Sequence, residues 1–101
     1  MKVKIKDIKG GMEDIEVVGR VKSVSSPIEV ETKFGPALLA VAVLEDETGS
    51  VRLNLWRWQV ELVKEGDVVR IVGAFAKEWK GQIELNVGSK GRIIVFKKSI
   101  R

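Results

Sequence analysis

The strongest constraint on the fold of this chain is a series of short β-branched runs, each ended by a turn signal. The runs are rich in Val and Ile, and Gly, Pro, Ser or Asp residues separate them. This spacing is typical of an all-β domain, because β-branched residues favour strands whereas Gly and Pro interrupt them. We expect strands at 14–25, 28–32, 37–45, 50–57, 67–75 and 82–87, with 92–96 extending the last one.

The connections between these strands are distinctive. Ser25-Ser26-Pro27 interrupts pairing, and the sequence predicts turns at 33–36 and 45–49, a loop at 76–81 and a break at 88–91. The best helical pattern, at 58–65, is short. This order is typical of the OB-fold, a five-stranded Greek-key barrel with a short helix between its third and fourth strands. An SH3-like barrel fits less well because it lacks a helix at that point.

Size and composition favour one folded domain. The chain has 101 residues, of which 45% are hydrophobic and 32% charged. We expect a single domain over 1–101, with a barrel core of about 13–96 and basic extensions at both ends. No apolar run has the ~20 residues needed to cross a bilayer, and the N-terminus lacks a signal-peptide pattern. We therefore expect a cytoplasmic protein without a membrane partner.

The chain contains neither Cys nor His. Disulfides are impossible, and the usual zinc ligands are missing. Nucleophilic catalysis through Cys–His or Ser–His pairs is excluded. We therefore expect no catalytic residues, no metal and no cofactor, and a protein that is not an enzyme.

Net charge gives only weak support for nucleic-acid binding. The chain carries +4, but residues 13–84 hold nine Lys or Arg and thirteen Asp or Glu. The positive excess therefore lies at the two ends, and the argument must come from local placement of cations and aromatics.

The segment 50–57 carries the clearest functional pattern. Alternation would turn Val51, Leu53 and Leu55 into the core and Arg52, Asn54 and Trp56 outward. Arg contacts phosphates and stacks, Asn bonds base edges, and Trp offers a π-face. The alternative is that Trp56 packs under a loop as peripheral core.

The segment 75–81 carries a second pattern. Trp79 lies between Lys77 and Lys80 at an expected hairpin tip, which combines charge with stacking, although a Trp packed against the loop is the alternative. Strict alternation makes Phe75 core, whereas a bulge at Gly73 would turn it outward. The residues alone leave that choice open.

Five further side chains outside these two segments' main patterns are also assigned roles. We expect Lys33 and Arg57 to contact phosphates, with Phe34 either clamping the strand or lying exposed in its turn. We interpret Trp58 as a cap on the barrel bottom, with nucleic-acid contact as the alternative, and Phe96 as core.

These patterns resemble those of the archaeal simple single-stranded DNA-binding proteins, which are related to the small SOSS-complex subunits and to the OB domains of replication protein A. The resemblance covers nearly all of residues 3–95. It rests on Val43–Trp56, Lys64–Val69, Trp79–Asn86 and Gly88–Gly91.

The resemblance implies three stacking aromatics, which match Trp56, Phe75 and Trp79, and so it favours the outward orientation of Phe75. It also implies that Arg52, Asn54, Thr32 and Lys33 lie in the groove. Family members commonly carry a flexible partner-recruiting tail after the barrel. This sequence ends at Arg101 without such a tail. Replication or repair proteins stay possible partners, and the alternative is that the basic end contacts the phosphate backbone or another subunit.

We therefore expect a monomeric, sequence-tolerant binder of single-stranded DNA in replication and repair, covering roughly 4–6 nucleotides. Two alternatives remain open: an RNA- or tRNA-binding OB module, and an OB subunit that assembles with proteins in a replication protein A-like complex.

Overall fold

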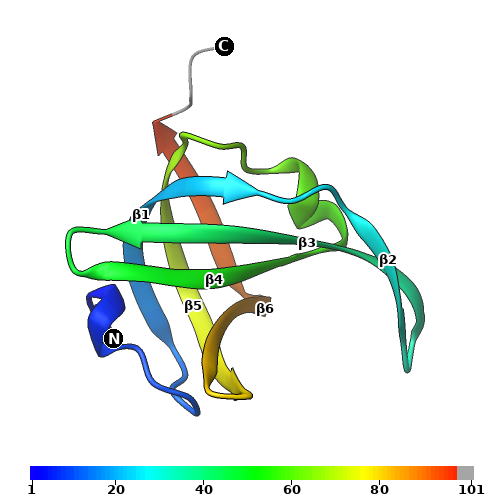
Figure 1. Cartoon of the computed structure of the whole chain (residues 1–101), viewed down its shortest axis with the longest axis horizontal. Helices are drawn as coiled ribbons and strands as arrows, with labels where there is room; N and C mark the ends of the chain where they lie inside the picture. Colours follow the sequence, from blue (N-terminus) through cyan, green and yellow to red (C-terminus); the bar gives the residue numbers. More distant parts are fainter. Residues whose placement is uncertain (98–101) are drawn as a thin grey trace.

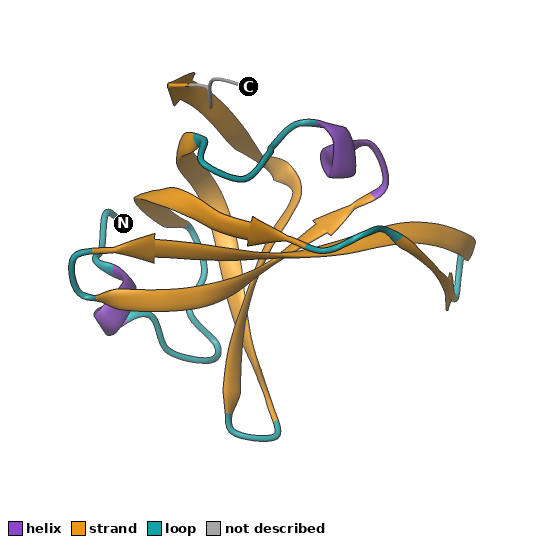
Figure 2. Cartoon of the chain, turned by 45° about the horizontal axis from the view of Figure 1, so that its top comes forward, coloured by secondary structure: helices purple, strands orange, loops and turns teal. Residues whose placement is uncertain are grey.

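The computed structural model describes residues 1–97, with side chains for residues 1–96. Six strands and two short 3-10 helices follow one another along the chain (Figures 1 and 2). Their bounds are η1 Ile5–Asp7, β1 Ile15–Val24, β2 Ile28–Thr32, β3 Gly35–Asp46, β4 Gly49–Trp56, η2 Arg57–Glu61, β5 Val68–Trp79 and β6 Gln82–Lys97. The predicted all-β OB-fold is confirmed.

Five strands close the barrel. β1 pairs with β5 and β3, β5 with β6, and β3 with β4, all antiparallel. The ring is completed by parallel pairing of β4 with β6, in the register Arg52↔Glu84, Leu53↔Leu85 and Asn54↔Asn86. β2 is the sixth strand and pairs with the beginning of β3, so the two form a hairpin that projects from the barrel (Figure 1).

The core follows the alternation expected from the sequence. Side chains from every barrel strand are fully buried, and the largest are Ile15, Leu44, Leu53, Leu55, Ile71 and Leu85. The N-terminal segment adds to this core, because Ile5 and Ile8 are buried within it. Gly19 lies where two strands cross, and a Cβ atom there would come within 2.7 Å of the Glu45 carbonyl oxygen.

A bulge at Gly73 reverses the alternation of β5. Pairing with β6 passes from Val72↔Arg92 to Ala74↔Val87, so the register shifts at this glycine. Val69 and Ile71 are buried before the bulge, and Ala74 and Ala76 after it. Gly73 has φ of +70°, and a Cβ atom on it would lie 3.0 Å from the Cα of Gly91. The bulge therefore turns Phe75 outward. This is the second of the two orientations that the sequence left open.

Three connections differ from expectation. Residues 76–79 belong to β5 and do not form a loop, because the β5–β6 hairpin continues to a two-residue turn at Lys80 and Gly81, both at positive φ. Beyond the buried Ala76, residues 77–79 of this hairpin are exposed, so their sequence lacks an apolar alternation. η2 is shorter than the predicted helix, and β6 runs through 88–91 without ending.

The N-terminal segment is held by the turn between β3 and β4. The Asp46 carboxylate accepts hydrogen bonds from the N–H of Ile5 (2.9 Å) and from the N–H of Thr48 (2.7 Å). Desolvation raises the pKa of Asp46, but the hydrogen bonds from Thr48 and Ile5 outweigh it and hold the pKa below its ordinary value of 3.8. At the surface, Lys4 pairs with Glu47 at 2.7 Å.

In residues 1–97, neither 3-10 helix has the length or apolar character needed to cross a bilayer.

We predict that Gly73→Ala destabilises the domain by about 1–2 kcal/mol, because an L side chain is strained at positive φ and its Cβ would press on Gly91. Urea denaturation measures the change. Gly88→Ala is the control, since its Cβ would meet Phe75 at an ordinary 3.5 Å. Equal losses in the two variants would contradict this explanation of the bulge.

We predict that Asp46→Ala destabilises the domain by about 1 kcal/mol at pH 7, because two backbone N–H groups lose their acceptor. The folded pKa of Asp46 is lowered, so its contribution is present above its unfolded pKa and is lost as the pH falls through the folded value. Urea midpoints of the wild type and the variant should therefore converge as the pH falls below 3.8, the ordinary pKa of an Asp carboxyl group.

The control is Glu47→Ala, which removes only an exposed ion pair and should change stability little. A difference between wild type and Asp46→Ala that stayed constant through the acid range would refute the role of the carboxylate.

Candidate nucleic-acid interface

A trough runs across the outer face of three adjacent strands. On β4, Arg52, Asn54 and Trp56 turn away from the buried Val51, Leu53 and Leu55, as predicted. The register sets Glu84 and Asn86 of β6 beside Arg52 and Asn54. On the far side of β6, Asn86 pairs with Phe75 and Glu84 with Lys77. We call this surface the trough: Arg52, Asn54, Trp56, Phe75, Lys77, Trp79, Glu84 and Asn86.

A polar network forms the floor of the trough. Asn54 is only 4% exposed, and its side-chain oxygen accepts a hydrogen bond from Arg52 Nε at 2.9 Å. Its amide nitrogen donates to Glu84 and to Asn86, each at 3.2 Å. Asn86 also accepts from the indole N–H of Trp56 at 3.2 Å. Arg52 completes the network through an ion pair with Glu84 at 3.7 Å.

This network changes the role of two predicted residues. The side chain of Asn54 is occupied by three protein partners, so it fixes its neighbours and is not free to read a base edge. Arg52 is held by Asn54 and Glu84. Trp56 is half-buried with its N–H anchored on Asn86, which orients its ring.

Glu84 and Asn86 were not predicted as site residues. Their partners on β4 are more than 30 residues earlier in the chain, so no local motif reveals them. Strand alternation along 82–87, in which Leu85 and Val87 are buried, is the signal that could have predicted an outward orientation for Glu84 and Asn86.

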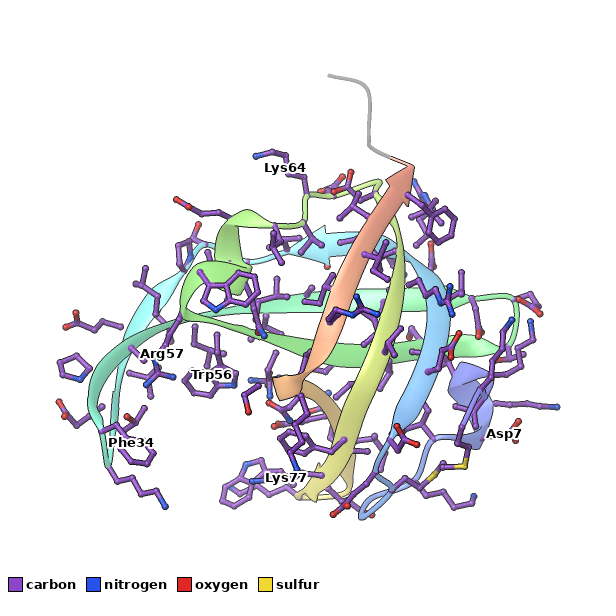
Figure 3. The ribbon with its side chains drawn as sticks, turned by 180° about the vertical axis from the view of Figure 1, so that it is seen from behind. Asp7, Phe34, Trp56, Arg57, Lys64 and Lys77 are labelled. Carbon is purple, nitrogen blue, oxygen red and sulfur yellow. The ribbon has the colours of Figure 1, made fainter. Side chains whose placement is uncertain are left out.

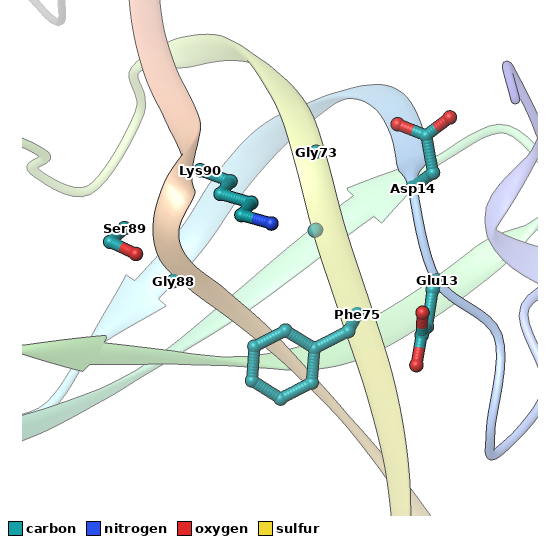
Figure 4. Close-up of a pocket in the computed structure, with 8 residues that line it drawn as sticks. Glu13, Asp14, Gly73, Phe75, Gly88, Ser89 and Lys90 are labelled. Atoms are coloured by element: carbon teal, nitrogen blue, oxygen red, sulfur yellow. The ribbon is translucent and has the colours of Figure 1, made fainter.

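Phe75 lies between two hollows of about 400 Å³ each, and Gly88 and Ser89 line both of them. The first, the Trp56 hollow, is lined by Trp56, Phe34, Trp58, Arg57, Thr32 and Phe75 among others. The second, the acidic hollow, includes Glu13, Asp14 and Lys90 (Figure 4). The trough is therefore concave on both sides of Phe75.

The β5–β6 hairpin carries the third predicted aromatic. Alternation after the bulge sets Trp79 on the same face of β5 as Phe75 and Lys77, and Trp79 is 61% exposed. Four residues of strand separate the two rings by roughly 13 Å along β5. Lys77 Nζ lies 5.8 Å from the Phe75 ring centroid, and Lys80 Nζ lies 5.6 Å from that of Trp79.

The β2–β3 hairpin carries the remaining predicted residues. The Thr32 hydroxyl donates to the Gly35 carbonyl at 2.7 Å and accepts from the N–H of Phe34, so it stabilises the turn. Lys33 is exposed, with its Nζ 5.3 Å from the Phe34 ring centroid. Figure 3 shows Phe34 on this hairpin, Trp56 between it and β6 in the view, and Lys77 on the β5–β6 hairpin.

Two aromatic predictions are wrong. Trp58 does not cap the barrel, because it is 69% exposed and lines the Trp56 hollow. Gln59 is the buried residue of η2 instead: it accepts from the N–H of Trp56 and donates to the Val87 carbonyl. Phe96 is not core but 57% exposed, because Ile93 and Val95 are the β6 side chains that pack against the core.

Arg57 stands where the chain turns from β4 into η2. It is exposed, lines the Trp56 hollow and has φ of +58°, a conformation that costs a non-glycine residue about 1–2 kcal/mol. Within residues 1–97, no group of three His, Cys, Asp or Glu side chains is arranged to hold a metal ion.

Comparison with known proteins agrees with this geometry. Single-stranded DNA binding protein Ssb of Saccharolobus solfataricus is 40% identical over 93 residues, which cover 92% of this chain and 63% of the relative. Replication factor A of Methanothermobacter thermautotrophicus is 37% identical over 83 residues, which cover 81% of this chain and 10% of the relative. The chain thus spans less than two thirds of the length of either curated relative.

The solution structure of an OB domain from Thermoplasma acidophilum superposes with a TM-score of 0.82 at 26% identity, covering 99% of this chain and 91% of that one. The predicted similarity to archaeal single-stranded DNA-binding proteins is confirmed. The profile of the OB-fold nucleic acid binding domain matches residues 15–94. The chain belongs to this OB-fold nucleic acid binding domain family.

Proposed function

We propose that this domain binds single-stranded DNA with little sequence preference and acts by binding alone. The observation that carries the proposal is that Trp56, Phe75 and Trp79 lie on one face of three adjacent strands. The names of two relatives, a single-stranded DNA binding protein and a replication factor, support the choice of ligand. The biological setting that fits is DNA exposed during replication and repair.

Stacking explains the expected tolerance of sequence. Every base has a π-face, and each base stacked on an aromatic side chain contributes about 1–3 kcal/mol. Trp56 and Phe75 lie two strands apart, roughly 10 Å, and Trp79 lies further along β5. Three ring faces along one surface can therefore take separate bases of a single extended strand.

Cations on the rim of the trough supply the phosphate contacts. Lys33, Arg57, Lys77 and Lys80 are all exposed, and the charge of Arg52 is offset by Glu84. Three of these lysines rest over aromatic rings before DNA binds. A base that stacks on such a ring displaces the ammonium group, which then becomes free to contact a neighbouring phosphate.

We predict that poly-dT quenches Trp fluorescence and that Trp56→Ala, Phe75→Ala and Trp79→Ala each weaken binding about tenfold or more, or ~1.4 kcal/mol. Three to four phosphate contacts predict a slope of log K against log salt of about −2 to −3. Phe96→Ala is the control, since it removes an exposed aromatic outside the trough.

Titration with an RNA oligomer of the same length and sequence distinguishes DNA binding from RNA binding. If RNA bound tenfold more tightly than DNA, an RNA-binding module would replace the present assignment. If neither oligomer bound, or if all three trough variants kept wild-type affinity, the stacking proposal would be wrong.

We predict that Asn86→Ala weakens DNA binding several-fold although it removes no stacking ring. Asn86 holds the indole N–H of Trp56, so its loss frees the ring and adds an entropic cost to binding. The effect should vanish in a Trp56→Ala background, which a double-mutant cycle measures. Additive losses would show that Asn86 acts independently of Trp56.

A further inference from the structure

Two aromatic side chains beside Trp56 are largely exposed and do not pack into the core. Phe34 is 80% exposed at the tip of the β2–β3 hairpin, and Trp58 is 69% exposed on η2. Large apolar side chains in water stabilise neither the core nor the fold, whereas rings gathered at one place mark a binding surface. Both rings line the Trp56 hollow, together with Trp56 itself.

Hydrogen bonds hold the backbone beside each of these rings. Gln59 ties η2 to the end of β4 through the N–H of Trp56 (2.9 Å) and to β6 through the Val87 carbonyl (2.8 Å). The Thr32 hydroxyl closes the β2–β3 turn under Phe34. The hollow between hairpin and helix is therefore built from anchored backbone, so less conformational entropy is lost when a ligand enters it.

The two hollows that meet at Phe75 differ in the charges of the side chains that line them. The Trp56 hollow is lined by Arg57 and by no carboxylate, and Lys33 stands beside Phe34 at its edge. The acidic hollow contains two carboxylates, Glu13 and Asp14, and one cation, Lys90 (Figure 4). The charges of the first hollow therefore favour a polyanionic strand that passes from Phe75 to Trp56 more than those of the second hollow do.

We infer that Phe34 and Trp58 form a second base-binding subsite, which takes one or two nucleobases of the same strand beyond Trp56. The inference rests on the proposed function and extends it. The strand then runs from the β5–β6 hairpin, across the trough, to the β2–β3 hairpin. Lys33 and Arg57 contact the phosphates at this end, and the subsite lengthens the footprint beyond the three rings of the trough.

A length series tests the subsite. Oligo-dT of three to ten nucleotides is titrated against the wild type, Phe34→Ala, Trp58→Ala and the double variant, with Phe96→Ala as control. The shortest oligomers occupy only the trough, so they should bind all of these proteins with the same affinity. Longer oligomers should bind the wild type more tightly and each single variant about tenfold more weakly. Phe34→Leu and Trp58→Leu keep apolar volume without a π-face and should lose the same affinity.

An abasic scan identifies the occupant. One abasic nucleotide is moved through the longest oligomer, and its cost is measured in the wild type and in the double variant. At one end of the oligomer, the abasic nucleotide should lower the affinity of the wild type about tenfold. It should not change the affinity of the double variant, because that variant lacks the rings on which the removed base would stack. Urea denaturation confirms that every variant is folded.

The outcomes separate this inference from the proposed function. If Trp56→Ala and Trp79→Ala weaken binding but the Phe34 and Trp58 variants match the wild type at every length, the subsite is refuted and the trough stands. If Trp56→Ala and Trp79→Ala also bind like the wild type, both fail. If no abasic position couples to Phe34 and Trp58, the hollow does not take a base, and the inference is overturned.

Discussion

The parallel pairing of β4 with β6 is the contact on which the site depends. It closes the barrel, and it brings residues 52–54 beside residues 84–86. Its inner face buries Leu53 and Leu55 against Leu85, and its outer face holds the amide network. One ladder therefore stabilises the core and also orients Trp56. A substitution that weakened it would disturb fold and site together.

The second constraint is the bulge on β5. Without the extra residue at Gly73, the alternation that buries Val69 and Ile71 would bury Phe75 as well. The close packing of Gly73 against Gly91 shows why a side chain cannot stand there without a shift of the backbone. The bulge at Gly73 thus places the Phe75 ring on the outer face of β5. The core is kept after the bulge, because Ala74 and Ala76 are buried there.

Strand alternation predicted most of the barrel and the outward face of β4, because each face of a strand has a simple period of two. Alternation did not predict the structure correctly where side chains on both faces of a segment are exposed, or where a side chain's role depends on a distant strand. The sequence at 76–79 predicts a loop because the exposed residues 77–79 show no alternation. Trp58, predicted to cap the barrel bottom, is exposed, and Gln59 is the buried residue of η2. Asn86 was missed because its role depends on a partner strand far away in the sequence. The hydrogen bond from the N–H of Ile5 to the Asp46 carboxylate likewise joins residues that are far apart in the sequence.

The central claim is that one face of the barrel, and no other, receives the strand. Titration of the ¹⁵N-labelled domain with a short oligo-dT, followed by amide and indole N–H signals, tests it most directly. The account predicts shifts of the Trp56 and Trp79 indole signals and of amides along β4, β5 and β6 that line the trough. Amides of the exposed face of β1, at Val18 and Arg20, should stay in place. Shifts centred on β1 with both indole signals unmoved would contradict the account.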